Sequence, residues 1–509
     1  MRDAKTGPSA NEIAEIWASL SVRERLARLL LIRSAAGPDG LPSEATLAAA
    51  GAGVGGFHGP PLHAYPPLQA VDGSREFIAA LRAHARRSHR LEPLIAANAE
   101  TGLAYTTGAG GTDVPYPAAL GELDPTRSRT AGRAVGQDLR ASGYDWCFQP
   151  VADVRSTLDD PVIGVRAFGS DPELVAAHVR EYGLGLQDAG VIATVKHLPG
   201  HGDASVDSHH GRPMVARTAV EQDRHLRPFA EAARAKLASM MTAHMMFEDA
   251  QERGVSTFDP AICTDLVRHQ LGFEGILVSD SLRMKAVSAE YSPAEAAVLC
   301  LRAGCDVANV KCPPEQVGEV LDGLEHALAQ NRLSEERVYE AFTRILTTQM
   351  SLAPNPDPTH QVAAEASPIL ADELRVAAVG QPQLDVAADD VLTVVMYQPP
   401  GEAPDAEAFG STLSRVIGHP IRVQYEFTPQ IDVAVVISYG QAGPTSWEQD
   451  VIARTEQAGI PAVVFLAGAP DLLERYTGAL PAVAVPALDV FGMPSLSGFS
   501  AGFGRILGR

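Results

Sequence analysis

The sequence lacks an excess of basic residues. Its 509 residues include 41 lysines and arginines but 62 aspartates and glutamates, which gives a formal net charge of −21. A field of this sign repels the phosphates of nucleic acids and of anionic membranes. We therefore expect no nucleic acid and no membrane among the partners of this protein.

The sequence has no pattern of paired cysteines, and we expect no signal peptide. The N-terminal “MRDAKTGPSANEIAEIWASL” has charged and polar residues where a signal peptide needs an apolar core. The cysteines are odd in number and contain no C-x-x-C pair, which argues against a disulfide framework or a zinc ribbon: Cys147, Cys263, Cys300, Cys305 and Cys312. Together these absences favour a reducing compartment, and we expect a cytoplasmic protein.

What the sequence does contain is a series of short apolar runs, each followed by a segment of helical periodicity. Runs that are apolar on both faces and alternate with helices are typical of buried parallel strands. Eight such runs predict an α/β fold of the (β/α)8 TIM-type barrel class, with a doubly wound sheet as the alternative. In order, the runs are “RLLLI”, “GVGGFH”, “EPLIAANAE”, “DWCFQPVADV”, “VIATVKHLPG”, “LASMMTAHMMF”, “GILVSDS” and “GCDVANV”.

The barrel pattern ends after the helical segment “LSEERVYEAFTRILTTQMSLAP”, where a proline-rich stretch follows. We expect a catalytic barrel over residues 1–352, a linker over 353–388 and a smaller α/β sandwich domain over 389–509. For the glycine-rich tail “FGMPSLSGFSAGFGRILGR” no element is predicted. Strands of the second domain are predicted at four apolar runs: “DVLTVVMYQ”, “DVAVVISYG”, “PAVVFLAG” and “PAVAVPAL”.

Polar and charged residues follow several of the barrel runs. In a barrel of this class the C-terminal strand ends form the active face, so these side chains are candidates for one shared site. They are Glu100, Asp153, Lys196 with His197, His244 and Asp280.

A histidine-rich segment, “TVKHLPGHGDASVDSHHGRP” over residues 194–213, admits three interpretations. Its four histidines and two aspartates suggest a metal site, but the “LPG” between His197 and His201 prevents helical spacing of those ligands. A phosphate loop would need a G-K-[ST] or G-x-G-x-x-G pattern, which the segment lacks. The third interpretation is acid–base chemistry by His209, with the Asp207 carboxylate orienting its imidazole.

Such an acid–base pair needs a nucleophile or a base opposite it. Asp280, in “GILVSDSLRMKAV”, ends a strong apolar strand run and is the best candidate. The structural alternative for Asp280 is a helix N-cap, because aspartate begins helices readily.

Five motifs in order resemble family 3 glycoside hydrolases of the bacterial β-N-acetylglucosaminidase branch, over most of residues 20–350. They are “GYDWCFQPVADV”, “VIGVRAFGSDPE”, “KHLPGHGDASVDSHHGRP”, “MMTAHMMF” and “GFEGILVSDSLRMKAV”. The resemblance implies a retaining exo-β-glycosidase, in the first place a β-N-acetylhexosaminidase. It implies Asp280 as nucleophile and His209, paired with Asp207, as acid and then base. No cofactor and no metal are implied.

The same resemblance implies that Arg166, Lys196 and His197 hydrogen-bond the hydroxyls of a small carbohydrate or glycoconjugate substrate. The structural alternative for Lys196 is a surface salt bridge. Phosphorolysis, with phosphate as the acceptor, stays open beside hydrolysis, because a neutral histidine base does not repel an anion.

One position departs from the family pattern. Where the family shows D-Q-E-G-G, the stretch “AANAETG” places Asn98 at the position of the aspartate. An amide both donates and accepts, so the hydroxyl pattern that it reads can differ. This favours a specialised β-glycosidase for a modified sugar or metabolite conjugate as an alternative. Two further alternatives are not glycosidases of this mechanism: a non-catalytic sugar-binding relative and a metal-dependent hydrolase.

Overall fold

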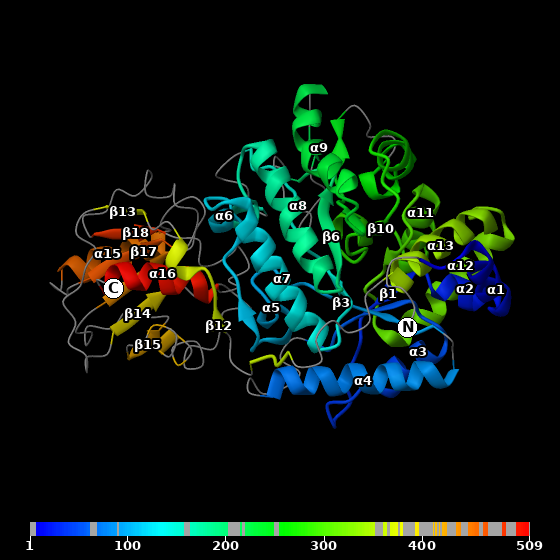
Figure 1. The fold of residues 1–509 in the computed structure, drawn as a ribbon, viewed down its shortest axis with the longest axis horizontal. Helices are drawn as coiled ribbons and strands as arrows, with labels where there is room; N and C mark the ends of the chain where they lie inside the picture. The colour runs from blue at the N-terminus through cyan, green and yellow to red at the C-terminus, as the bar shows by residue number, and fades with distance from the viewer. Residues whose placement is uncertain are drawn as a thin grey trace.

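The computed structural model confirms a barrel of eight parallel strands, so the doubly wound alternative is wrong (Figure 1). The strands are hydrogen-bonded in the order β10-β8-β6-β5-β3-β2-β1-β11, and a parallel bridge between Val278 and Val307 brings β10 next to β11. Each strand lies within one of the eight predicted runs. They are β1 (Leu30–Ile32), β2 (Gly56–His58), β3 (Leu94–Ala97), β5 (Trp146–Cys147), β6 (Ile192–Leu198), β8 (Ser239–Thr242), β10 (Ile276–Ser279) and β11 (Ala308–Asn309).

The structure describes the chain except for the following residues: 1–6, 62–68, 89–90, 157–162, 202–213, 216–218, 249–253, 352–359, 364–366, 375–376, 380–391, 397–410, 412, 415–416, 418–419, 425–433, 439–445, 458–461, 467–480, 485–494 and 508–509.

The barrel strands are apolar because both of their faces are covered. All seven residues of β6 are buried, as are all residues of β1, β3, β8 and β10. Side chains of the barrel interior and of the surrounding helices join in one hydrophobic core. Continuous burial therefore explains why these runs do not alternate between apolar and polar residues.

Helices surround the barrel and fill the connections between its strands. A typical start is that of α8, where the Asp171 side chain accepts the Glu173 backbone N–H at 3.0 Å and Pro172 takes the first helical position. The main helices are α1 (Ala10–Ser19), α2 (Val22–Ala27), α3 (Glu44–Gly51), α4 (Ala70–Ser88), α7 (Pro125–Ala141), α8 (Pro172–Asp188), α9 (Ala219–Arg234), the π-helix η5 (Ala261–Gln270), α11 (Pro293–Ala303), α12 (Val317–Ala329) and α13 (Glu335–Ser351).

Short elements complete this half of the chain. They are α5 (Ala104–Thr107), β4 (Thr112–Asp113), α6 (Pro117–Leu120), η2 (Gly164–Arg166), β7 (Met214–Val215), β9 (Met246–Phe247), η4 (Ser256–Phe258), α10 (Lys285–Ser288) and η6 (Pro314–Gln316).

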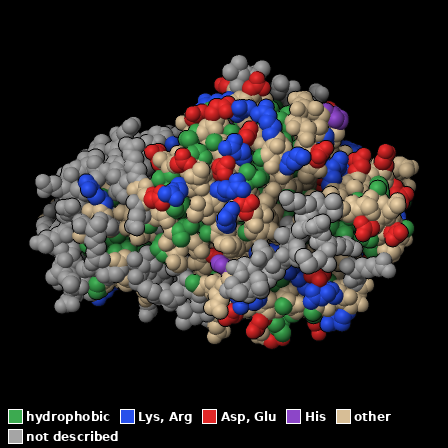
Figure 2. All heavy atoms as spheres, in the orientation of Figure 1, with side chains coloured by type: hydrophobic (Ala, Val, Ile, Leu, Met, Phe, Trp, Pro, Cys, Tyr) green, Lys and Arg blue, Asp and Glu red, His purple; other side chains and the backbone are tan. Residues whose placement is uncertain are grey.

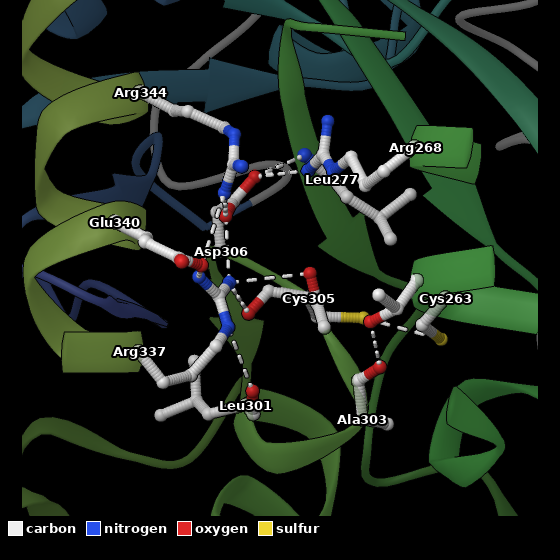
Figure 3. A network of polar contacts seen from close by, with 12 residues as sticks. Cys263, Arg268, Leu277, Leu301, Ala303, Cys305, Asp306, Arg337, Glu340 and Arg344 are labelled. Atoms are coloured by element: carbon white, nitrogen blue, oxygen red, sulfur yellow. Dashed lines mark hydrogen bonds and ion pairs between the residues drawn. The ribbon is translucent and has the colours of Figure 1, made fainter. Parts of the chain in front are cut away.

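A buried carboxylate fixes the N-terminal end of β11 (Figure 3). Asp306 is fully buried and accepts bonds from three arginines on η5 and α13 as well as from the Leu277 N–H. The arginines are Arg268 (2.6 Å), Arg337 (2.7 Å) and Arg344 (3.1 Å). A buried charge is tolerated only when it is paired in this way, so Asp306 holds two helices against the strand pair β10 and β11.

A second α/β domain follows the barrel and contains the C-terminus (Figure 1). Its mixed sheet has the order β13-β18-β17-β16-β14-β15, in which only the pairing of β13 with β18 is antiparallel among the described strands. The four predicted strands are confirmed. The elements are β13 (Ala377–Val379), β14 (Leu392–Met396), β15 (Ile421–Gln424), β16 (Ala434–Ser438), α15 (Ser446–Gln457), β17 (Ala462–Leu466), β18 (Ala482–Ala484) and α16 (Leu496–Ile506).

The glycine-rich tail forms α16, although its sequence predicted no element. Phe499 and Phe503 lie on one face of this helix and pack against Phe465 of β17, with ring centroids 5.3 and 5.4 Å apart. Burial of aromatic side chains at helical spacing therefore outweighs the low helix propensity of the glycines around them.

The two domains contact each other through the segment between them. Strand β12 (Ser367–Pro368) pairs with β4 of the barrel half, and Arg127 forms an ion pair at 2.8 Å with Glu373 of the short helix η7 (Ala371–Glu373). Both β12 and β13 lie inside the range 353–388, which the sequence predicts as a linker. The described part of that range therefore contains two strands, which pair with β4 and β18.

The surface carries charges of both signs. On the face shown in Figure 2, acidic and basic side chains are interspersed over the barrel half, and hydrophobic side chains form only small groups. All five cysteines are buried and free. None of the described helices combines the length and the apolar character needed to cross a membrane.

Candidate active site

The sequence-predicted site residues that the structure describes lie at the C-terminal ends of the barrel strands. Asn98 comes directly after β3, Lys196 and His197 lie near the end of β6, and Asp280 comes directly after β10. Arg166 ends η2. Parallel strands of a barrel bring these ends together at one face. Asp207 and His209 lie outside the described residues.

Glu100 brings two of these residues together. Its carboxylate accepts two bonds from Arg166, from Nε and from Nη2, both at 2.8 Å, and one from Lys196 Nζ, also at 2.8 Å. All three side chains are buried. Burial alone would raise the pKa of Glu100, but Arg166 and Lys196 hold that pKa far below its ordinary value. Glu100 is therefore an anion that fixes two cations.

These contacts exclude the surface salt bridge as the role of Lys196, because its side chain is only 3% exposed. Its ammonium lies 3.5 Å from Asn98 Oδ1, at the limit of a hydrogen bond, and much closer to Glu100. Asn98 itself is half-buried. The position that is acidic in the resembled family is thus a loosely bound neutral amide beside a buried lysine.

Asp153 orients His197. The carboxylate is fully buried and accepts a bond from His197 Nδ1 at 2.8 Å and another from the His201 backbone N–H at 2.6 Å. Burial opposes ionisation, but the charge and hydrogen bond of His197 together with His201 lower the pKa of Asp153 to about 2. Because Nδ1 is occupied, Nε2 of His197 is the ring nitrogen left for a ligand.

Asp280 is not a helix N-cap. Helix α10 begins at Lys285 with Met284 as its N-cap residue, so the structural alternative for Asp280 is wrong. Its backbone N–H donates to the Thr242 carbonyl at 3.0 Å, and its Oδ1 accepts the Ser281 N–H at 2.6 Å. No ion pair within 4 Å engages this carboxylate in the part of the chain that the structure describes.

The surroundings of Asp280 keep its carboxylate ionised. Burial alone would raise its pKa, but the histidines His197 and His244, the Ser281 N–H and the Lys196 ammonium together lower that pKa to about 2. The side chain is half-buried at the mouth of the barrel. A charged, uncommitted carboxylate at a strand end is suited to act as a nucleophile or as a base.

His244 supports the loop that carries Asp280. Its Nε2 donates to the Ser281 carbonyl at 3.0 Å, and its Nδ1 lies 2.9 Å from Thr257 Oγ1. Burial lowers the pKa of His244. The sequence places His244 at a strand end but gives no sign of this role, which depends on a carbonyl 37 residues further along the chain.

The described residues contain no group of three or more histidine, cysteine, aspartate or glutamate side chains that could hold a metal ion. What they do assemble is a carboxylate without an ion pair, Asp280, near a fixed lysine and an oriented histidine, and the lysine shares Glu100 with a fixed arginine. Such a set can bind a polyhydroxylated ligand through charged donors while the carboxylate faces a reacting atom.

Comparisons with known proteins agree with this chemistry. The model of the glycosyl hydrolase family 3 N-terminal domain matches residues 62–348. A β-hexosaminidase of Thioalkalivibrio sulfidiphilus is 36% identical over 251 residues, which are 48% of this chain and 71% of the relative. One of Methylococcus capsulatus is 36% identical over 248 residues, 48% of this chain and 74% of the relative. The solved structure of a family 3 β-N-acetylglucosaminidase from a Paenibacillus species has a TM-score of 0.78 at 26% identity and covers 96% of this chain and 97% of its own.

Proposed function

Because the chain belongs to glycosyl hydrolase family 3, we propose that it is a retaining exo-β-N-acetylhexosaminidase with Asp280 as its nucleophile. The chain is a glycoside hydrolase, and its substrate is a carbohydrate. The N-acetylhexosamine part of the proposal is supported by what the two relatives and the solved structure are named for.

The observation that carries the proposal is the state of Asp280. A retaining nucleophile must be ionised, must not be neutralised by a tight ion pair, and must stand at the mouth of the barrel. Asp280 has a pKa lowered to about 2, is half-buried at the end of β10, and offers Oδ2 without a hydrogen-bond partner among the described residues. Glu100 and Asp153, the two buried carboxylates of the site, are committed to cations or to a histidine.

In the proposed reaction an Asp280 oxygen attacks the anomeric carbon, and the bond from that carbon to the leaving oxygen breaks. The leaving oxygen takes a proton from His209. In the second half His209 removes a proton from water, and the water oxygen displaces Asp280 from the same carbon. Asp207 orients His209 throughout.

Support for the His209 and Asp207 roles comes from the sequence, since both residues lie outside the described ranges. Their spacing allows the carboxylate to reach the imidazole, and their segment follows β6, the strand that delivers Lys196 and His197 to the same mouth.

Arg166, Lys196 and His197 form the proposed site for the terminal sugar. Glu100 accepts only one of the three hydrogens of the Lys196 ammonium, so donors remain for sugar hydroxyls. His197 presents Nε2 because Asp153 holds Nδ1. Fixed side chains bind hydroxyls at a lower entropic cost than mobile ones.

A modified sugar is the second candidate for the substrate, and Asn98 favours it. Its amide is neutral, and its Oδ1 is only loosely bound by Lys196 at 3.5 Å. The site therefore carries one negative charge fewer than the family pattern would supply, and it gains an N–H₂ donor. Both changes suit a sugar with an added acceptor or an altered hydroxyl.

Asp280→Asn tests the proposal. The change keeps the shape of the side chain and removes its nucleophilicity, so the turnover of 4-nitrophenyl β-N-acetylglucosaminide should fall by several orders of magnitude while binding persists. Asp265→Asn is the matched control, because Asp265 lies on η5 and is 60% exposed. Assays with and without phosphate separate hydrolysis from phosphorolysis. Near-normal turnover by Asp280→Asn would refute the nucleophile, and no turnover by the wild type on any hexosaminide would refute the substrate class.

A further inference from the structure

Three basic residues follow three neighbouring strands at the C-terminal end of the barrel. Arg33 comes directly after β1, Lys311 follows β11, and Arg283 follows β10 beyond the nucleophile. Strand β11 pairs with β1, and the bridge between Val278 and Val307 connects it to β10. We call Arg33, Lys311 and Arg283 the cationic sector.

The backbone holds these strand ends together, so the sector is part of the barrel frame. Three hydrogen bonds cross between the strands: Arg33 N to Cys312 O (3.1 Å), Lys311 N to Leu31 O (3.1 Å), and Leu282 N to Asn309 O (3.0 Å). Arg283 follows Leu282 directly. Each cation is therefore anchored within one or two residues of a bonded strand end.

Among the described residues, no ion pair compensates the charges of the sector, in which Arg33 and Arg283 are exposed. Burial lowers the pKa of Lys311, Asp280 opposes this shift, and Arg33, Lys196 and Arg283 lower the pKa further. Within the described ranges, none of the three cations has a carboxylate at ion-pair distance. The carboxylate that acts on Lys311 is thus the proposed nucleophile itself.

The other end of the barrel shows how this chain compensates clustered arginines. There, Arg268, Arg337 and Arg344 converge on the buried Asp306 (Figure 3). Among the described residues, the cationic sector has no such carboxylate, although the chain has 62 acidic residues and a net charge of −21. Like charges held together without a counter-charge are unfavourable, which points to a counter-charge from outside the protein.

Lys311 also adopts an unfavourable backbone conformation. Its φ is +50°, in the left-handed region, which costs a residue other than glycine about 1–2 kcal/mol. Such conformations persist where the surrounding structure enforces them, and they are frequent at binding sites. The backbone bond from Lys311 N to Leu31 O enforces it here.

Neutral donors border the sector. Burial, Lys311 and Arg33 lower the pKa of His58 to about 3, so its imidazole is uncharged at neutral pH. Nε2 of His58 then donates to Asn309 Oδ1 at 2.9 Å, which leaves the Asn309 amide N–H₂ as a donor. Cations and neutral N–H groups together form the donor set that binds oxyanions.

We propose that the cationic sector binds an anionic group, a carboxylate, sulfate or phosphate, that the substrate carries beside the bond to be cleaved. This inference rests on the proposed function, because it takes Asp280 as the reacting carboxylate. It narrows the substrate class to acidic glycosides. In the barrel, β6 reaches β10 through β8, whereas β11 and β1 lie on the other side of β10, and β3 reaches β1 through β2. The sector therefore borders Asp280, and Lys196 is near enough to act on Lys311 electrostatically.

Matched substrate pairs test the proposal. One pair is 4-carboxyphenyl and 4-carbamoylphenyl β-N-acetylglucosaminide, which differ in the charge of the leaving group. The other is 4-nitrophenyl β-N-acetylglucosaminide with and without a 6-sulfate. In at least one pair the wild type should prefer the anionic member by about tenfold or more in kcat/KM, the scale of one charge-assisted hydrogen bond. The preferred pair shows whether the anion belongs to the leaving group or to the sugar.

Three variants remove single charges of the sector. They are Lys311→Asn, whose asparagine tolerates the left-handed backbone, Arg33→Gln and Arg283→Gln. Each should reduce the ratio of kcat/KM between the anionic and neutral members by about fivefold or more, and added salt should weaken the wild-type preference. Arg302→Gln is the control, since Arg302 is exposed and lies in the last turn of α11, which precedes the N-terminal end of β11; it should keep the wild-type ratio.

The opposing outcomes are distinct. Equal kcat/KM within both pairs, or a ratio that the three variants leave unchanged, would overturn the proposal. Inorganic phosphate can also be the anion that the sector binds. In that case phosphate accelerates turnover of the neutral substrates with formation of a glycosyl phosphate, Lys311→Asn abolishes this acceleration, and the charge of the substrate does not affect kcat/KM. This result would show that the sector binds a free anion and that the proposal is wrong.

A binding measurement separates this proposal from the proposed function. Calorimetric titration with N-acetylglucosamine 6-sulfate and with N-acetylglucosamine needs no turnover. Tighter binding of the sulfate by the wild type, lost in Lys311→Asn, would support the sector even if Asp280→Asn retained activity. Equal binding of the two sugars, together with equal kcat/KM in the leaving-group pair, would refute the sector even if Asp280 were the nucleophile.

Discussion

Glu100→Gln is the perturbation that most sharply tests the organisation of the sugar site. The substitution keeps the size of the side chain but removes the charge that holds Arg166 and Lys196 through three bonds of 2.8 Å. Because Glu100 is 2% exposed, no solvent replaces that charge. Two buried cations then face a neutral amide whose N–H₂ group repels them.

The magnitude follows from the burial of the cluster. Loss of one partner from a buried ion pair costs about 3–5 kcal/mol. Single charge-assisted bonds are worth about 1.5–3 kcal/mol each, but the three bonds share one carboxylate and do not add independently. We therefore expect the free energy of unfolding of the barrel to fall by about 3–5 kcal/mol. Displacement of the two cations by about 1 Å should also lower kcat/KM on the order of 100-fold.

Urea denaturation followed by tryptophan fluorescence measures the first effect. Two of the three tryptophans, Trp17 and Trp146, lie in the barrel half, and Trp146 donates from Nε1 to Thr194 of β6. Glu325→Gln is the matched control, because Glu325 pairs with Arg23 at the surface and should cost less than about 1 kcal/mol. Equal stability losses in the two variants, with kcat/KM of Glu100→Gln within twofold of wild type, would refute the organising role of Glu100.

Three other outcomes are expected. The pKa of Asp153 is lowered to about 2, so its ionised carboxylate stabilises the folded protein by about 2–3 kcal/mol above the ordinary aspartate pKa of about 4, and this stabilisation is lost as the pH falls through 2. Urea titrations at several pH values should show this acid-dependent loss of stability in the wild type but not in Asp153→Asn. The same loss in Asp153→Asn would contradict the assignment. Asn98→Asp should alter the rank order among gluco-configured, galacto-configured and modified substrates by about 1–3 kcal/mol of discrimination, whereas an unchanged order in kcat/KM would show that Asn98 does not read the sugar. His209→Ala should lower the turnover of glycosides with poor leaving groups far more than that of activated aryl glycosides, and azide should restore turnover. An equal loss for both kinds of glycoside, without rescue by azide, would exclude His209 as the acid and base. Asp207→Ala should show a smaller loss of the same kind.

Sequence patterns predicted the barrel well because buried parallel strands have a strong local signal. Each of the eight runs is apolar on both faces, and each contains a strand of the sheet. The tail was not predicted, since the glycines around Phe499 and Phe503 obscure a helix whose stability comes from packing on Phe465. The strands β12 and β13 were not predicted either, because their partners β4 and β18 lie far away in the sequence.

The site was predictable in its residue types but not in its contacts. Glu100 follows a strand in the sequence, yet nothing local indicates that its partner Arg166 lies 66 residues away on η2. The cationic sector is hidden for the same reason, since Arg33 and Lys311 become neighbours only through the pairing of β1 with β11. Strand order, which no short segment encodes, decides which charges meet.

In the proposed mechanism, Asp280 forms the covalent bond to the sugar. The most direct measurement is mass spectrometry of peptides from the enzyme after inactivation with a 2,4-dinitrophenyl β-glycoside whose sugar carries fluorine, which slows breakdown of the glycosyl-enzyme. We expect one added sugar per chain on the peptide that contains Asp280, and none in Asp280→Asn. A sugar attached to any other residue, or time-dependent inactivation without a covalent adduct, would contradict this mechanism.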